Sequence, residues 1–200
     1  MTGLIIFLLA VIIASVIAVI VVSLKNISAE PYEPPRMRAG RDGEYEAFGI
    51  IKSVMRDDDS LFSNVEIAYD GKQTELDNVI VNRYGVFIIE VKNYVGYIVG
   101  EEDDFEWRKY KTTRAGNIYE KNVKNPIKQV KRQIYILAKY LNWYGIDVWV
   151  DGYAILLEGN SPVKSRYVLS CIADVDKAIH GNGKKPLPKK TVKAIADLLS

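Results

Sequence analysis

A glutamate and a lysine two residues apart, Glu90 and Lys92, have the types and spacing best suited to chemistry in this 200-residue chain. They directly follow an uninterrupted apolar run at residues 86–89, which predicts a strand covered on both faces. Residues i and i+2 of a strand point to the same face, so the two charged side chains would project together at the edge of a buried region. Buried charge is costly unless it is paired or binds a metal, so the pair predicts a partner elsewhere in the chain.

Asp77 is the candidate partner. Residues 61–69 predict a strand, Asp70-Gly71 predicts a tight hairpin turn, and residues 73–81 predict the return strand. Because side chains alternate along the return strand, Leu76, Asn78 and Ile80 would share one face and Asp77 would lie on the other. Because Glu90 lies on the next strand after a tight turn, the two carboxylates are expected to converge.

Two carboxylates at a sheet edge, with a lysine beside them, form the kind of site that holds Mg²⁺, which prefers one or two carboxylates, water and substrate phosphate. Such an ion would cancel the repulsion between Asp77 and Glu90, lower the pKa of a bound water and stabilise charge on a phosphodiester. Lys92 would position the attacking water or stabilise the transition state. The alternative is an ordinary ion pair between Lys92 and either carboxylate.

Residues 39–56 predict a helix whose apolar residues recur every three to four positions. Glu44 falls on the same stripe as Ala47, Phe48, Ile51 and Met55. Its carboxylate would therefore lie either on the inward face or at the border of the stripe in solvent, and the pattern leaves both open. The three aspartates at residues 57–59 that end this helix suggest a metal site, but a solvated turn is the favoured interpretation.

Asn125-Pro126 predicts the start of a second helix, since Asn is a favoured N-cap and Pro a favoured first helical residue. The helix is expected to run to about Tyr144 and to stop at Gly145. Its first turn contains Gln129, at the border of the apolar face. The predicted buried stripe is Ile127, Val130, Ile134, Leu137 and Leu141.

Cations without an intervening acid lie mainly on another face of this helix: Lys124, Lys128, Lys131, Arg132 and Lys139. Positive charge near a helix N-terminus costs roughly 0.3–1 kcal/mol per residue, and a phosphate group would relieve that cost. We therefore predict that a nucleic acid binds the first four cations of this list. A solvated basic face is the alternative.

The remaining pattern predicts a hairpin of residues 96–100 and 105–111, with a solvated acidic tip at residues 101–104. Further strands are expected within residues 147–158 and 167–172. Two helices complete the prediction, at residues 173–180 and 191–199.

The amino-acid composition excludes several kinds of site. The chain is 48% apolar and 26% charged, as in globular proteins. A single cysteine, Cys171, excludes an internal disulfide and fits a reducing compartment. A single histidine, His180, excludes a multi-histidine zinc site, and excludes a Ser-His-Asp triad unless His180 itself serves. The net charge of +2 does not indicate a nucleic-acid partner; only the distribution of charge could.

Residues 3–24 contain no charged side chain and are almost wholly apolar. As a helix they would reach about 33 Å, enough to cross a bilayer core. A signal peptide would have Lys or Arg before its apolar segment, and none precedes this run. The cations begin at Lys25, so the positive-inside rule predicts a single-pass anchor in the cell membrane with the C-terminal domain in the cytoplasm.

Four short motifs, taken in this order, resemble the nuclease-related domain, NERD, of the PD-(D/E)xK nuclease superfamily. The resemblance covers roughly residues 39–157. The motifs are Gly40-x-x-Gly43-Glu44, Glu75-Leu76-Asp77, Gly85 to Asn93 with Gly96 beyond, and Asn125-Pro126-x-x-Gln129. The chain departs from the family pattern at Asn78, where the family often has a histidine that makes a supporting contact.

The resemblance implies an α/β fold of α+β character, in which a central mixed β-sheet is flanked by helices as in restriction endonucleases. It implies Asp77 and Glu90 as metal ligands, with the Val91 carbonyl as a further ligand. It also implies Lys92 as the catalytic lysine, and Glu44 and Gln129 as supporting catalytic residues. The expected domains are an anchor at 1–25, a linker at 26–38, a NERD core at 39–160 and an extension at 161–200 that completes the domain.

These observations lead to a membrane-anchored nuclease that uses Mg²⁺, or Mn²⁺ in its place, to hydrolyse phosphodiester bonds in DNA. Two alternatives stay open. One is a non-catalytic module that binds nucleic acid or acts as a scaffold at the membrane. The other is a protein-interaction module whose charges form surface ion pairs.

Overall fold

The computed structural model describes residues 13, 15–17, 35–181 and 185–200. The chain divides into two units, Met1–Met37 and Arg38–Ser200. Among the described residues, no helix is long and apolar enough to cross a membrane. The anchor predicted at residues 3–24 falls outside the described residues, apart from the few helical positions at 13 and 15–17.

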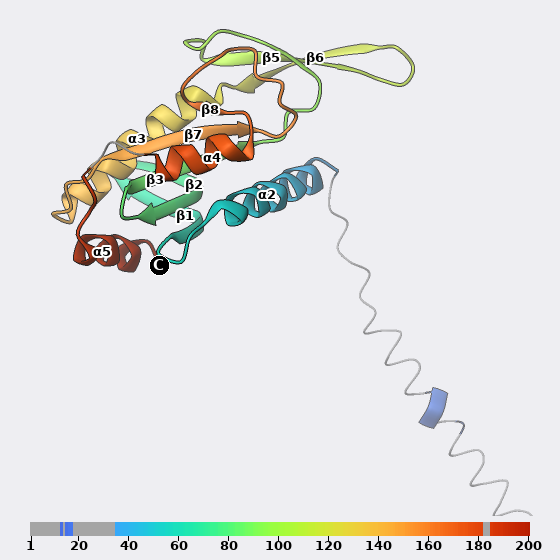
Figure 1. Cartoon of the computed structure of the whole chain (residues 1–200). Helices are drawn as coiled ribbons and strands as arrows, with labels where there is room; N and C mark the ends of the chain where they lie inside the picture. The colour runs from blue at the N-terminus through green and yellow to red at the C-terminus, as the bar shows by residue number, and fades with distance from the viewer. Residues whose placement is uncertain (1–12, 14, 18–34, 182–184) are drawn as a thin grey trace, which may run out of the picture. The chain divides into compact units, whose positions relative to one another are not determined.

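A five-stranded mixed sheet forms the centre of the second unit, in the order β1-β2-β3-β7-β8 (Figure 1). Its first three strands are antiparallel neighbours, whereas β3, β7 and β8 run parallel. The strands are β1 (Ser60–Tyr69), β2 (Lys72–Asn82), β3 (Gly85–Lys92), β7 (Val150–Leu156) and β8 (Val168–Leu169). Every residue of β3 except Lys92 is buried, as the apolar run before Glu90 predicts.

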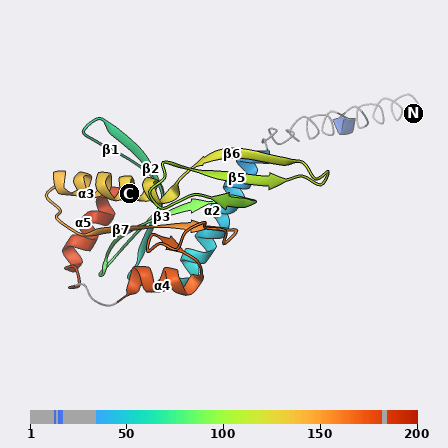
Figure 2. The ribbon, with the colours of Figure 1, turned by 90° about the horizontal axis from the view of Figure 1, so that it is seen from above.

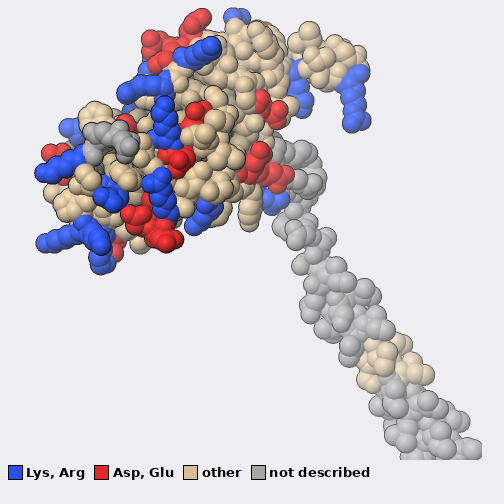
Figure 3. Space-filling view, viewed as in Figure 1, with Lys and Arg blue, Asp and Glu red and all other residues tan. Residues whose placement is uncertain are grey.

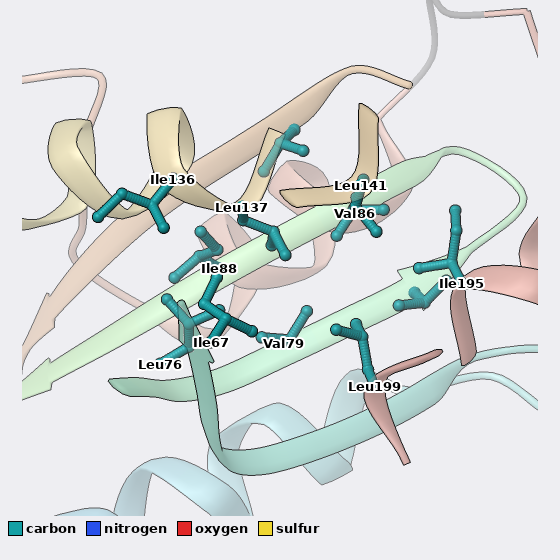
Figure 4. Packing of buried hydrophobic residues seen from close by; sticks show 12 residues of the cluster. Ile67, Leu76, Val79, Val86, Ile88, Ile136, Leu137, Leu141, Ile195 and Leu199 are labelled. Atoms are coloured by element: carbon teal, nitrogen blue, oxygen red, sulfur yellow. The ribbon is translucent and has the colours of Figure 1, made fainter. Parts of the chain in front are cut away.

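Helices cover both faces of this sheet, which confirms the predicted mixed sheet flanked by helices. On one face, α3 (Pro126–Trp143) and α5 (Lys189–Leu199) pack on β2 and β3 through a cluster that includes Ile88, Leu137 and Ile195 (Figure 4). On the other face, α2 (Pro35–Val54) and α4 (Ile172–His180) contribute Ile51 and Ile179 to a second cluster. Each fully buried Ile or Leu contributes roughly 1.5–3 kcal/mol, so the two clusters hold the sheet between the helices.

The β1–β2 hairpin forms around the predicted turn, where Asp70 and Gly71 have φ values of 51° and 71°. Its pairing is interrupted at one position: Ser63 pairs with Asn78 and Val65 with Leu76, but Asn64 and Asp77 between them form no pair. Asn64 has a φ of 54°, the left-handed region that few non-glycine residues adopt.

This break makes one prediction wrong. Leu76 and Ile80 do not share a face, because Leu76 packs with Val79 in the cluster beneath α3 and Ile80 packs in the cluster on the other face. The apolar face of β2 changes sides at Asp77, where the pairing is interrupted. A strict alternation of two cannot predict such a change.

A second, three-stranded sheet has the order β4-β5-β6 and extends from the central sheet (Figure 2). It consists of β4 (Tyr97–Val99), β5 (Glu106–Thr112) and β6 (Ile118–Lys124), all antiparallel. The pairing of β4 with β5 was expected, but β6 was not. Six of the seven β6 residues are exposed, so this strand has no alternation of apolar and polar residues to signal it.

Candidate active site

Glu90 is a fully buried carboxylate on the face of β3 that α3 covers. Its Oε1 accepts hydrogen bonds from Gln129 Nε2 at 2.5 Å and from the Lys92 ammonium. Its Oε2 accepts one from Gln133 Nε2 at 2.6 Å. A carboxylate offers about four lone-pair positions, so these three donors leave one position for a further ligand.

Gln133 is the residue of this site that the sequence prediction missed. It lies one turn after Gln129 on α3, is fully buried, and also donates to the Glu75 carbonyl at 3.1 Å. An amide inside the apolar face of a helix, four residues after Gln129, was the available signal. Two buried amide oxygens, Gln129 Oε1 and Gln133 Oε1, have no hydrogen-bond partner within the described part of the chain.

Asp77 lies beside Glu90 at the end of the β2–β3 ladder. The last registered pair joins Asn78 and Ile89, so Asp77 and Glu90 occupy the next opposing position. Asp77 Oδ2 accepts a hydrogen bond from the Val91 backbone N–H at 2.8 Å. Burial, with the nearby charge of Glu90, raises the pKa of Asp77 to about 7, although the Val91 N–H and Lys92 act in the opposite direction.

Glu44 joins Asp77 from α2. Both line a cleft of about 370 Å³, together with Tyr45 and Asn64, and the charge of Glu44 also raises the pKa of Asp77. The Glu44 side chain is exposed, so it lies at the border of the apolar stripe of α2 and not on the buried face of the helix. Gly43 allows this approach, because a Cβ there would lie 3.0 Å from Leu157 Cδ1.

Lys92 is largely buried, with 19% of its side chain exposed, and forms an ion pair with Glu90. Asp77, Glu90, Lys92 and Gln129 are therefore brought together, with Glu44 at the edge. The described residues contain no group of three or more His, Cys, Asp and Glu side chains placed to hold a metal. Any cation here would depend on two carboxylates plus neutral oxygens, which is a ligand set that suits Mg²⁺ and does not suit zinc.

The acidic segment at residues 101–104 is largely exposed, as predicted, but cations of α3 also lie against it. Lys131 Nζ lies 3.0 Å from Glu102 Oε1, and Lys128 Nζ lies 3.5 Å from Asp103 Oδ1. Hydrogen bonds with the side chains of Lys131 and, to a smaller extent, Ser165 hold the pKa of Glu102 below its usual range. The acid-free basic face that led us to predict nucleic-acid binding here is therefore partly neutralised within the fold.

The other two predicted nucleic-acid contacts have their own neighbours. Arg132 Nη2 donates to the Gln73 carbonyl at 3.1 Å. Lys124, on β6, is exposed and lies directly across from Glu106. Binding of nucleic acid by these four cations stays a prediction, but Lys124, Lys128 and Lys131 each lie beside an acidic residue.

The single histidine lies apart from Glu90, on the opposite face of the sheet. His180 Nε2 lies 2.9 Å from Asp59 Oδ2, and its Nδ1 lies 2.7 Å from Asp176 Oδ1. The expected solvated turn is correct for Asp57 and Asp58, which are exposed, but wrong for Asp59, whose side chain is almost completely buried.

Comparison with protein families gives one match. Residues 39–157 match the family model described as "NERD: Nuclease-related domain", and this range contains Glu44, Asp77, Glu90, Lys92 and Gln129. Searches of curated proteins and of solved structures found no match.

Proposed function

The chain belongs to the family of nuclease-related domains, and we propose that it is a Mg²⁺-dependent nuclease of the PD-(D/E)xK superfamily that hydrolyses phosphodiester bonds in DNA. The observation that carries this proposal is the buried carboxylate of Glu90, held by Lys92 and two glutamines beside a second carboxylate, Asp77. Burial of the Glu90 anion costs free energy, so a role in catalysis or ligand binding explains its presence better than a contribution to stability does.

The residues fit a divalent cation. Burial and, after it, the charge of Glu90 raise the pKa of Asp77 although Lys92 lowers it, so a further positive charge would stabilise the Asp77 carboxylate. The unpartnered Gln129 Oε1 adds a neutral oxygen acceptor close to Glu90. Asp77 and Glu90 would hold the ion, with the Val91 carbonyl as a further ligand. When bound, Mg²⁺ would supply charge stabilisation at the phosphate and a lower pKa for its water.

The protein's own residues would prepare this site. Gln129 and Gln133 each fix one oxygen of Glu90, so the carboxylate has a single orientation before substrate binds. The Val91 N–H fixes Asp77 in the same way. Lys92, which pairs with Glu90 here, would hold the attacking water or the phosphate oxygen on which charge develops.

We also propose that the apolar segment at residues 3–24 anchors the protein in the membrane, with the nuclease domain in the cytoplasm. The absence of charge along that segment, and the cations that begin at Lys25, support this. Mn²⁺ is expected to replace Mg²⁺, because both are hard cations that prefer oxygen ligands.

The test is nicking of supercoiled plasmid DNA by the full chain in detergent, with Mg²⁺ or with EDTA. Lys92→Ala should reduce the Mg²⁺-dependent rate by about 10²-fold or more. Lys193→Ala is the matched control, since it removes an exposed lysine of α5 that pairs only at the surface with Asp197. DNA binding without any nicking in Mg²⁺ or Mn²⁺ would instead support the non-catalytic alternative.

A further inference from the structure

The charged side chains on one face of the β5–β6 hairpin are all basic. Its residues alternate sides, so one face carries Trp107 and Val123 near the core, where they pack in a cluster with Ile127 of α3. Further out, the same face carries Lys109, Lys111, Tyr119 and Lys121. We call these four residues the basic face of the hairpin. The opposite face is mixed, because the two glutamates of the hairpin, Glu106 and Glu120, lie there together with Arg108 and Lys124.

The basic face brings like charges together. Lys109 and Lys121 are direct cross-strand partners, and Lys111 lies across from Tyr119. Like charges directly opposite one another in a sheet repel, and a bound polyanion would relieve that repulsion. Residues 105–124 contain six Lys and Arg side chains against two Glu. In Figure 3 the lobe that contains the tip of this hairpin shows blue side chains and no red ones.

The basic face begins near the candidate active site and extends away from it. The Lys109 ammonium lies 5.8 Å from the centre of the Tyr94 ring, and Tyr94 follows Lys92 by two residues. The Tyr94 hydroxyl donates a hydrogen bond to the Lys124 carbonyl at 3.0 Å, so Tyr94 connects the end of β3 to the inner end of the hairpin. Tyr94 and Lys109 thus lie between Lys92, which pairs with Glu90, and the outer part of the hairpin.

We propose that the basic face of the β5–β6 hairpin holds the phosphodiester backbone of the DNA whose cleavage is proposed above. The lysines would contact phosphates on one side of the scissile bond, and the exposed ring of Tyr119 would contact a sugar or base. The description of this DNA as substrate rests on the proposed function, but binding itself does not. Charge complementarity favours a polyanion over any neutral partner, and the nearness of the basic face to the candidate active site favours DNA over a lipid surface.

The test is the salt dependence of DNA binding by the full chain in neutral-lipid nanodiscs, measured by fluorescence anisotropy with a labelled duplex and EDTA present. The variant replaces Lys109, Lys111 and Lys121 by Gln. If each lysine contacts one phosphate, the slope of log K against log salt should become shallower by about 2.7. An unchanged circular dichroism spectrum checks that the variant stays folded.

The matched control replaces Lys185, Lys189 and Lys190 by Gln, which removes the same number of charges from exposed positions at and before α5. This control should keep the wild-type slope. Equal slopes for the wild type and the hairpin variant, or equal losses in the hairpin variant and the control, would overturn the proposal. So would binding of anionic vesicles that depends on the three lysines while binding of DNA does not.

Failure of the proposed function gives a different result. If the wild type never nicks DNA with Mg²⁺ or Mn²⁺, but the hairpin variant loses the salt-dependent binding, the nuclease proposal fails and the binding face stands. If nicking occurs and the hairpin variant binds and cuts as the wild type does, the binding face fails and the nuclease proposal stands.

Discussion

At the scale of single residues, the site depends on donors that surround one buried carboxylate. Gln133 supplies one of the three hydrogen bonds to Glu90 and has no contact with solvent. Its role is therefore to orient and stabilise Glu90, and it should act on stability as well as on chemistry.

Gln133→Leu should destabilise the fold by about 1–3 kcal/mol, because Glu90 Oε2 loses its donor while it stays buried. Urea unfolding measures this change. In a Glu90→Leu background the same substitution should cost less, since no carboxylate is left unsatisfied, and the difference gives the coupling energy. Equal costs in the two backgrounds would show that Gln133 acts through packing and its hydrogen bond to the Glu75 carbonyl, and not through Glu90.

Asp77 should make the metal-free protein less stable as pH rises. Its pKa is raised in the folded state, from 3.8 to about 7, so between these values the folded protein binds more protons than the unfolded chain. Stability should therefore fall by on the order of 2–4 kcal/mol across this window and level off above about pH 7. Asp77→Asn should flatten the profile in EDTA, measured by urea unfolding at several pH values. Profiles of the same shape for the wild type and Asp77→Asn would contradict this electrostatic account.

At the scale of elements, α3 positions both glutamines, and its distance from the sheet depends on a glycine in β7. A Cβ at Gly152 would lie 2.8 Å from Val130 Cγ1 and 2.9 Å from Ile134 Cγ1. These contacts are too close to be accepted without a shift of the helix.

Gly152→Ala should therefore cost about 1–3 kcal/mol and weaken Mg²⁺ binding, because α3 moves away with Gln129 and Gln133. Unfolding and Mg²⁺ titration calorimetry measure the two effects. Gly49→Ala is the control: that position in α2 has open space around it, so a gain of about 0.5–1 kcal/mol is expected. A Gly152→Ala variant as stable as the wild type would show that α3 is not tightly fixed.

The elements that bury apolar residues were predictable from sequence. Strand β3, the β1–β2 hairpin and α3 carry clear periodicity, a turn dipeptide or a cap, and the structure has all three. Strand β6 was not predictable, because almost all of its side chains are in water and only pairing with β5 defines it. The change of face at Asp77 also required the structure, since it depends on the left-handed conformation of Asn64 in the neighbouring strand.

At the scale of the whole molecule, the interactions between charges could not be predicted from spacing along the chain. Glu102 and Lys131 are 29 residues apart, yet they form an ion pair across two elements. The proximity of the two carboxylates was easier to predict, because strand order alone placed Asp77 and Glu90 on neighbouring strands.

Neutralising the acidic segment should strengthen DNA binding. In a variant that combines Glu102→Gln with Asp103→Asn, Lys128 and Lys131 lose their intramolecular partners and become available to phosphates. Affinity should rise, and the salt dependence should steepen by up to about two counterions. The control pair, Asp57→Asn with Asp58→Asn, removes equal charge from an exposed turn. Equal gains from both pairs would mean that only net charge matters, and that the α3 cations do not contact DNA.

The rate of plasmid nicking by the full chain in Mg²⁺, compared between the wild type and Glu90→Gln, tests the nuclease proposal most directly. The substitution keeps the size of the side chain and removes the buried negative charge next to Asp77 and Lys92. We predict nicking by the wild type and a rate lower by about 10²-fold or more for the variant, with an unchanged circular dichroism spectrum. Nicking by Glu90→Gln at the wild-type rate, or no nicking by the wild type in either Mg²⁺ or Mn²⁺, would contradict the proposal.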